Sequence, residues 1–183
     1  MRLAEDMNGH FRDPRGGFFD TRAEHGDLIT RPKDIQDNAT PSGNALAASA
    51  LLHLSAFSGA VGWQTQAETA LLAIQEAMVR YPTACGLWLQ GLDFAVGPVH
   101  QVAVSGSQQD PLTGQMLSYL WQDYRPRMVV AAAEDGAYVN PDTPELLRGR
   151  RAIDGKPTTY VCQAFTCKLP VTSLEGLQKQ LDG

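Results

Sequence analysis

The spacing of apolar residues changes near the middle of this sequence, and no other feature limits the possible folds as strongly. Before Gly97-Pro98, apolar residues recur every three or four positions, which is typical of amphipathic helices. After this pair, two apolar runs typical of strands lie on either side of another helical pattern. The sequence therefore predicts an α+β protein with two parts, residues 1–97 and residues 98–183.

The first part is predicted to be an array of antiparallel helices. Apolar spacing indicates helices near 41–58, 62–81 and 84–95, and short connections favour antiparallel neighbours. Thr40 is placed to cap the first of these helices, and Pro41 suits its first turn.

A helix and a turn are expected before this array. Leu3, Met7 and Phe11 have the spacing of a helix that ends near residue 11. The pair Gly16-Gly17, with the alternating residues after it, predicts a turn with short hairpin arms.

The second part is predicted to be a small α/β module. Its expected strands and helices, in chain order, lie near 99–105, 111–124, 127–133, 158–165 and 173–181. The first strand, the helix and the second strand form a βαβ unit, which places the two strands in parallel. Thr172 and Glu175 have the spacing of a capping box at the start of the last helix.

Charge and hydropathy exclude several classes of partner. A net charge of −5 argues against nucleic acid, because phosphate binding requires a basic face. The basic run RGRR at 148–151 is interpreted as a solvated loop. No apolar run approaches the roughly 18 to 20 residues that cross a bilayer, and the first residues lack the apolar region of a signal peptide. We therefore expect a cytoplasmic protein without a membrane partner.

The sequence lacks the motifs of common cofactors and nucleophiles. The segment GSQQDP after the first strand does not have the G-x-G-x-x-G pattern, so no nicotinamide cofactor is expected. Ser42 and Ser105 lie in neither of the nucleophile motifs G-x-S-x-G and S-x-x-K. The four histidines do not have the spacing of metal ligands.

Small polar residues gather before the first strong helix, in the segment DNATPSGN. Asp37, Asn38, Ser42 and Asn44 could bind a carboxylate, a phosphate or a sugar hydroxyl, since a helix N-terminus offers free N–H groups. The same residue types are ordinary helix caps, and spacing alone favours that interpretation. A glycosidase carboxylate pair could also come from this loop-rich region, although acids in loops are usually solvated. Its acids are Asp20, Glu24, Asp27, Asp34 and Asp37.

Cys162 and Cys167 are separated by four residues in the segment YVCQAFTC. In an extended strand their Cα atoms would lie about 16 Å apart, at roughly 3.3 Å per residue. A disulfide requires Cα atoms within about 7 Å. Unbonded structural cysteines are therefore the leading interpretation. A disulfide or a shared metal requires a tight bend from Gln163 to Thr166.

Several segments together resemble one known family. They are GGFFDT, LITRPKDIQDNATPSGNALAASALLHL, AIDGKPTTYVCQAFTCKLPVT and the closing helix. In this order they are similar to the C-terminal part of the long thioredoxin-domain-containing proteins, the spermatogenesis-associated thioredoxin-like family. That family joins an N-terminal thioredoxin-like domain to an (α/α) toroid similar to six-hairpin glycosidases and N-acylglucosamine 2-epimerases.

The resemblance implies that residues 1–97 are part of a helical toroid and that residues 98–183 form a module after it. The chain has no counterpart of the thioredoxin-like domain or of the earlier toroid hairpins, so we expect a fragment of a longer protein. The residues expected at the mouth of the toroid, as ligand-pocket candidates, are Asp20, Asp37, Asn38, Ser42 and Asn44.

Three functions follow from these expectations. The leading one is a catalytically incomplete fragment, because fold analogy alone does not make an enzyme. One alternative is a carbohydrate-binding or carbohydrate-active module with a sugar as its partner. The other is a redox-sensitive element, in which the pair Cys162 and Cys167 serves the family's thioredoxin-like domain. The exposed edge of a partial toroid should be apolar, so we also expect the chain to self-associate.

Overall fold

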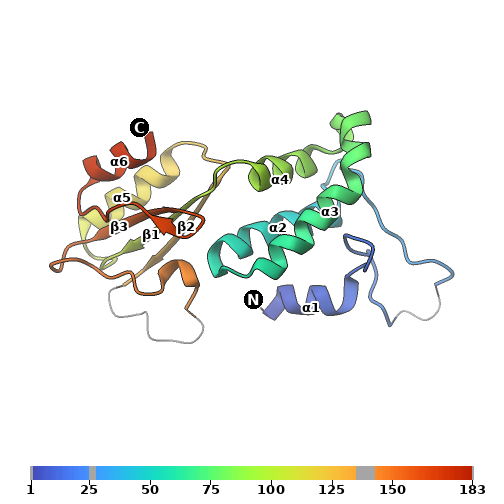
Figure 1. Ribbon diagram of the computed structural model, residues 1–183, viewed down its shortest axis with the longest axis horizontal. Helices are drawn as coiled ribbons and strands as arrows, with labels where there is room; N and C mark the ends of the chain where they lie inside the picture. Colours follow the sequence, from blue (N-terminus) through green and yellow to red (C-terminus); the bar gives the residue numbers. More distant parts are fainter. Residues whose placement is uncertain (1, 25–27, 135–142, 183) are drawn as a thin grey trace. The chain divides into compact units, whose positions relative to one another are not determined.

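The computed structural model describes residues 2–24, 28–134 and 143–182. Within these residues it contains six α-helices and a four-stranded mixed sheet, which confirms the α+β prediction (Figure 1). The chain divides into two compact units. The helical unit comprises Met1–Ser55 and Ala60–Gly97, and the sheet unit comprises Ala56–Gly59 and Pro98–Gly183. No described helix is long and apolar enough to cross a bilayer.

The helical unit is built on small and apolar side chains at helical spacing. Its helices are α1 (Arg2–Phe11), α2 (Gly43–Ser58), α3 (Val61–Arg80), the short 3-10 helix η1 (Pro82–Ala84) and α4 (Gly86–Val96). Each of the three long helices contributes fully or almost fully buried residues, including Leu51, Ala67 and Trp88. Burying an aliphatic or aromatic side chain contributes about 1.5 to 3 kcal/mol, so this core holds the helices together.

Two predicted helix caps are wrong, each by one or two residues. Helix α2 begins at Gly43 because the hydroxyl of Ser42, and not that of Thr40, accepts a hydrogen bond from the N–H of Ala45 at 3.1 Å. Helix α6 (Leu174–Asp182) begins after Ser173, whose hydroxyl accepts from the N–H of Gly176 at 3.2 Å. Neighbouring Ser and Thr residues compete for the same capping role, and spacing does not decide between them.

The turn expected at Gly16-Gly17 is present and joins α1 to the rest of the helical unit. Both glycines have positive φ, 116° for Gly16 and 74° for Gly17. A single antiparallel bridge between Arg12 and Phe18 takes the place of hairpin arms. A Cβ atom on Gly17 would lie 2.6 Å from the side-chain oxygen of Asn44, so this position has no room for a side chain.

The sheet unit contains the predicted strand–helix–strand pattern. Its elements are β1 (His100–Ser105), α5 (Pro111–Gln122), β2 (Met128–Ala133), the 3-10 helix η3 (Glu145–Leu147), β3 (Thr158–Gln163), β4 (Thr166–Cys167) and α6. The strand order is β2-β1-β3-β4. Strands β1 and β2 pair in parallel, as the βαβ pattern predicts, whereas β3 is antiparallel to both β1 and β4.

The two faces of this sheet are covered by different elements. Val102 and Val104 of β1 face α5 and α6, where Met116, Leu120 and Leu177 complete a fully buried cluster. Residues in a strand alternate between faces, so Gln101 and Ala103 point to the other side. The short helix η3 lies against β1 and β2, and its Leu146 and Leu147 are buried.

The strand expected over 158–165 is shorter, because the chain reverses after Gln163. Ala164 and Phe165 have φ values of 46° and 60°, and they form a two-residue hairpin loop between β3 and β4. Positive φ at both loop positions is the conformation that matches the twist of paired strands. The reversal places Cys162 directly opposite Cys167.

Candidate functional site

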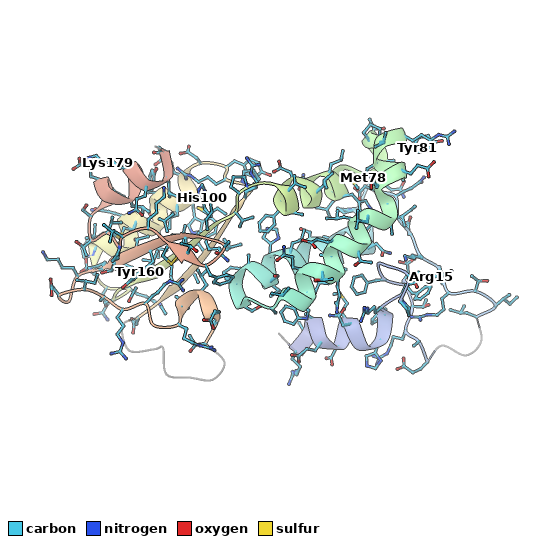
Figure 2. All side chains as sticks on the ribbon, viewed as in Figure 1. Arg15, Met78, Tyr81, His100, Tyr160 and Lys179 are labelled. Atoms are coloured by element: carbon cyan, nitrogen blue, oxygen red, sulfur yellow. A yellow bond between two sulfur atoms is a disulfide. The ribbon has the colours of Figure 1, made fainter. Side chains whose placement is uncertain are left out.

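Two groups of polar or reactive side chains are candidates for a site, one in each unit, and Figure 2 labels Arg15 in the first unit and Tyr160 in the second. The first surrounds the Gly16-Gly17 turn of the helical unit, near Arg15. The second lies at the β3–β4 hairpin of the sheet unit, on the strand that carries Tyr160. Each place is described by itself below.

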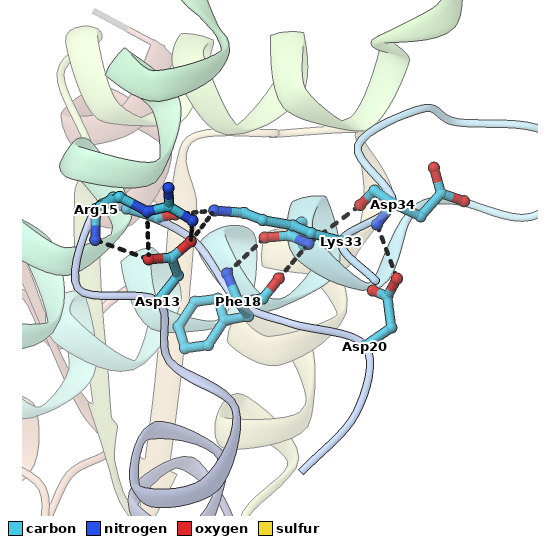
Figure 3. Close-up of polar contacts among 8 residues, drawn as sticks. Asp13, Arg15, Phe18, Asp20, Lys33 and Asp34 are labelled. Carbon is cyan, nitrogen blue, oxygen red and sulfur yellow. Dashed lines mark hydrogen bonds and ion pairs between the residues drawn. The ribbon is translucent and has the colours of Figure 1, made fainter. Parts of the chain in front are cut away.

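Asp13 is the buried anion of the first cluster (Figure 3). Its side chain is only 4% exposed, and its oxygens accept hydrogen bonds from the main-chain N–H of Arg15 at 2.9 Å and from Nζ of Lys33 at 3.3 Å. Burial by itself raises the pKa of Asp13, but the hydrogen bonds from Arg15 and Lys33 outweigh it and lower that pKa to about 2. Lys33 also donates to the carbonyl of Gly16, so this ion pair fastens the turn.

Asn44 lies beside this ion pair and is 1% exposed. Its side-chain oxygen accepts from the N–H of Phe18 at 2.6 Å, and its side-chain nitrogen donates to the carbonyl of Phe18 at 2.6 Å. The same nitrogen donates to the carbonyl of Asp34 at 3.1 Å. Asn44 therefore pairs with the main chain as a neighbouring strand would, and both of its N–H donors are in use.

Asp37 connects two helix starts. One of its oxygens accepts from the N–H of Ser42 at 2.9 Å, and the other accepts from the N–H of Leu87, in the first turn of α4, at 2.8 Å. The first N–H groups of a helix have no partner within the helix, so a carboxylate from elsewhere in the chain can cap them. Asp37 acts here as a cap for α4.

An open hollow of about 330 Å³ lies next to the turn. Its lining comprises Met7, Phe11, Phe18, Phe19, Asp20, Gly43, Asn44 and Ala47. Of the five pocket candidates, Asp20 and Asn44 meet at this hollow, whereas Asp37, Asn38 and Ser42 are not among its lining residues. Asp20 is exposed, and one of its oxygens accepts from the N–H of Asp34 at 2.8 Å.

Arg31 brings a positive charge to this region through a cation–π contact with Phe19. The guanidinium carbon of Arg31 lies 4.0 Å from the ring centre of Phe19, and Arg31 donates to the carbonyl of His10 at 3.1 Å. Among the described residues, no group of three or more His, Cys, Asp or Glu side chains is placed to hold a metal ion.

The second place contains a disulfide. Cys162 and Cys167 are bonded to each other, and their Cα atoms lie 3.9 Å apart. The leading expectation of two unbonded structural cysteines is therefore wrong. It assumed an extended strand, whereas the reversal at Ala164 and Phe165 places the two residues opposite each other. Cys162 is 1% exposed, whereas Cys167 is exposed at the edge of the hairpin.

Arg150 contacts both sulfur atoms of this disulfide. One of its terminal nitrogens lies 3.1 Å from the sulfur of Cys167 and 3.4 Å from that of Cys162. Its other terminal nitrogen donates to the carbonyls of Glu145, at 3.0 Å, and of Leu146. Burial lowers the pKa of Arg150, and the acidic groups of Glu145 and Tyr160 oppose this shift.

Sequence reasoning missed the role of Arg150. The signal in the sequence is the basic run at 148–151, although its charge pattern alone predicts a solvated loop. Spacing does not indicate which of its arginines turns toward the sheet, since that depends on the path of the chain after η3.

The third cysteine, Cys85, is free and buried in the helical unit. Burial raises the pKa of its thiol, and the nearby carboxylate of Asp37 raises it further. A thiol that stays protonated is a poor nucleophile, so Cys85 is a packing residue.

Comparison with known proteins shows what the whole chain is similar to. No family model matches the chain. It is 31% identical over 185 residues to mouse spermatogenesis-associated protein 20, and 30% identical to the human and rat proteins of the same name. The chain is similar to a segment of a longer protein. The match covers 99% of this chain but only 23% of the length of each relative.

Proposed function

We propose that this chain acts as a non-catalytic part of a larger protein, in which the helical unit belongs to an (α/α) toroid and the sheet unit is a module that follows it. The observation that supports this proposal is the use of the candidate pocket residues as structural ties. Asn44, Asp37 and Ser42 direct their polar atoms to main-chain groups of the same unit. Groups already used in this way are poorly suited to acid, base or nucleophilic roles.

The carboxylates of the helical unit support the same proposal. Asp13 is held as an anion by Lys33 and Arg15, so it cannot donate a proton near neutral pH. Asp20 is exposed, and in retaining or inverting glycosidases a second carboxyl about 5 to 10 Å away completes the pair. The hydrogen bond between Asp34 and Asp20 comes from the main-chain N–H of Asp34, so it does not join the two carboxyl groups.

The test is an activity measurement on the purified chain. Glycoside hydrolysis and sugar epimerisation are followed with a panel of substrates, and the Asp20→Asn variant is measured beside the unaltered chain. We expect the rate of substrate conversion with either protein to equal the uncatalysed rate in buffer alone. Turnover by the unaltered chain that Asp20→Asn abolishes would overturn the proposal and assign a catalytic role to Asp20.

Sugar binding without turnover is the second candidate function, and the hollow next to the turn favours it. Its volume of about 330 Å³ lies within the range of small-molecule sites. Phenylalanine rings in its lining offer apolar faces, and the carboxylate of Asp20 can accept hydrogen bonds from hydroxyl groups. These are the two kinds of contact that a sugar ring requires.

Thermal unfolding in the presence of sugars tests this second function. A ligand that binds only the folded state stabilises it, by about 2.7 kcal/mol at a concentration one hundred times its Kd. The melting temperature rises as a result. Asp20→Asn should reduce the shift, whereas Asp6→Asn, on the exposed surface of α1, should leave it unchanged. An unchanged melting temperature with every sugar would reject the hollow as a sugar site.

A further inference from the structure

We propose that the Cys162–Cys167 disulfide is a thiol–disulfide exchange site, which a dithiol reductant opens by attack on the sulfur of Cys167. This activity goes beyond the proposed role of the chain as a non-catalytic part of a larger protein. It uses residues of the sheet unit alone and does not depend on the hollow of the helical unit.

Exposure determines which sulfur is attacked. A thiolate must approach one sulfur of a disulfide from the side opposite the sulfur that leaves. Cys167 lies exposed on the outer strand of the hairpin, whereas Cys162 is 1% exposed on β3. An incoming thiolate therefore reaches Cys167 and expels Cys162.

Arg150 assists the cleavage, whereas exposure sets its direction. One guanidinium nitrogen lies 3.4 Å from the sulfur of Cys162 and 3.1 Å from that of Cys167, and the group is held in place by the carbonyls of Glu145 and Leu146. A cation beside a cysteine stabilises the thiolate over the thiol. A stabilised thiolate is a better leaving group, so Arg150 assists the departure of Cys162. Arg150 is a positioning and stabilising residue in this scheme.

The exchange proceeds in two balanced steps. In the first, one thiolate of the reductant bonds to the sulfur of Cys167, the disulfide breaks, and its electron pair passes to the sulfur of Cys162. In the second, the other thiol of the reductant loses its proton and attacks the first reductant sulfur, which releases Cys167 as a thiolate. The two cysteines are then reduced, and the reductant holds the disulfide.

Reduction should loosen the hairpin. Ala164 and Phe165 adopt the left-handed conformation, which is unfavourable for residues other than glycine, asparagine and aspartate. Without the disulfide, this loop depends on backbone pairing and on one hydrogen bond, from the N–H of Phe165 to the side-chain oxygen of Gln101 at 2.8 Å. The redox state of the pair thus controls the order of β4, which has only two residues.

The first test identifies the attacked sulfur. The oxidised full-length chain is mixed with the monothiol glutathione, quenched with N-ethylmaleimide at short times, and the peptide 152–168 is sequenced by tandem mass spectrometry. We expect glutathione on Cys167 in the large majority of mixed disulfides. Glutathione mainly on Cys162, or free thiols at both Cys162 and Cys167 before any reductant is added, would overturn the proposal.

The second test measures the contribution of Arg150. Reduction by dithiothreitol is followed for Arg150→Gln, for Arg150→Lys and for the control Arg151→Gln, since Arg151 contacts Tyr160 through its main chain. A loss of charge that raises the pKa of the leaving thiol by about one unit slows the exchange less than tenfold, because the rate follows thiol pKa with a fractional Brønsted coefficient. We therefore expect Arg150→Gln to react roughly three times more slowly than the control.

Arg150→Lys retains the charge and should fall between these two rates. If Arg150→Gln does not fold, as judged by circular dichroism, the Arg150→Lys rate and the glutathione position decide the question. Equal rates for Arg150 and Arg151 variants that are both folded would remove Arg150 from the mechanism.

Discussion

Replacing Asn44 by alanine should destabilise the helical unit strongly, although the change removes only one buried side-chain amide. The change removes three hydrogen bonds, to the N–H and carbonyl of Phe18 and to the carbonyl of Asp34. A net hydrogen bond contributes about 0.5 to 1.5 kcal/mol, and a buried polar group left without a partner costs about 1 to 3 kcal/mol.

The main-chain groups of Phe18 decide the size of this effect. Phe18 is 4% exposed, so its N–H and carbonyl cannot regain full hydration when the amide is lost. We therefore expect Asn44→Ala to lower the free energy of unfolding by about 3 to 5 kcal/mol. Asn44→Asp keeps the shape but lacks the N–H donors, so a similar loss is expected.

Urea unfolding followed by tryptophan fluorescence measures this loss. Trp88 is 1% exposed in the helical unit, and its indole N–H donates to the carbonyl of Ile35 at 2.9 Å, so the change in its emission reports the unfolding of that unit. Trp121 of the sheet unit is already 66% exposed, so its emission should change less. Asn38→Ala is the matched control, because Asn38 is exposed in the same segment and should change stability by less than about 0.5 kcal/mol. If Asn44→Ala and Asn38→Ala unfold at the same urea concentration, the structural role assigned to Asn44 is wrong.

Three further predictions concern other parts of the helical unit. Gly17→Ala should cost about 2 to 4 kcal/mol, because φ is 74° and a Cβ atom would lie 2.6 Å from an amide oxygen. Gly9→Ala, where a Cβ atom meets nothing within 4 Å in α1, should instead raise the melting temperature, and equal effects at both sites would contradict this reasoning. Although burial opposes them, hydrogen bonds from the main-chain N–H of Arg15 and from the side chains of Arg15 and Lys33 lower the pKa of Asp13 from 3.8 to about 2. The stability that Asp13 contributes is therefore complete above about pH 4 and is lost as the pH falls toward 2. Asp13→Asn should flatten the fall in melting temperature over this interval, and an unchanged pH profile would exclude the ion pair as its cause. The apolar groove of about 550 Å³ between α3 and α4 should cause two copies of the chain to associate, and Leu72→Ser, at a position 69% exposed, should shift light scattering toward the monomer. A monomer at high concentration before any substitution would contradict this prediction.

Apolar spacing predicts most of the helices and strands, because burial of one face repeats along each element. The long helices α2 and α3 and the strand–helix–strand pattern of β1, α5 and β2 follow from it directly. Capping residues are predicted less well, since adjacent Ser and Thr side chains offer the same hydroxyl and only the final path of the chain decides between them.

The hairpin at Ala164 and Phe165 has no local signal, because neither residue favours positive φ. Partners distant in the sequence hold it, including Gln101, which is 64 positions away from Phe165. The roles of the polar candidates were open for the same reason. Asn44 is bonded to a residue 26 positions away, and Asp37 to one 50 positions away. Local spacing predicts a cap or a ligand equally well, and tertiary contacts choose between the two.

The segment after the hairpin also protects one edge of the sheet from other chains. The edge of β3 that faces away from β1 is covered by β4, by the N–H of Lys168 and by Val171, which exchanges two hydrogen bonds with Thr159. A bare strand edge rich in β-branched residues invites pairing with another molecule, whereas a lysine and a proline on the outermost strand discourage it. Lys168 and Pro170 occupy that outer position. Opening the disulfide would free the first residues of this cover, so the oxidised pair is expected to delay fibril formation by the sheet unit.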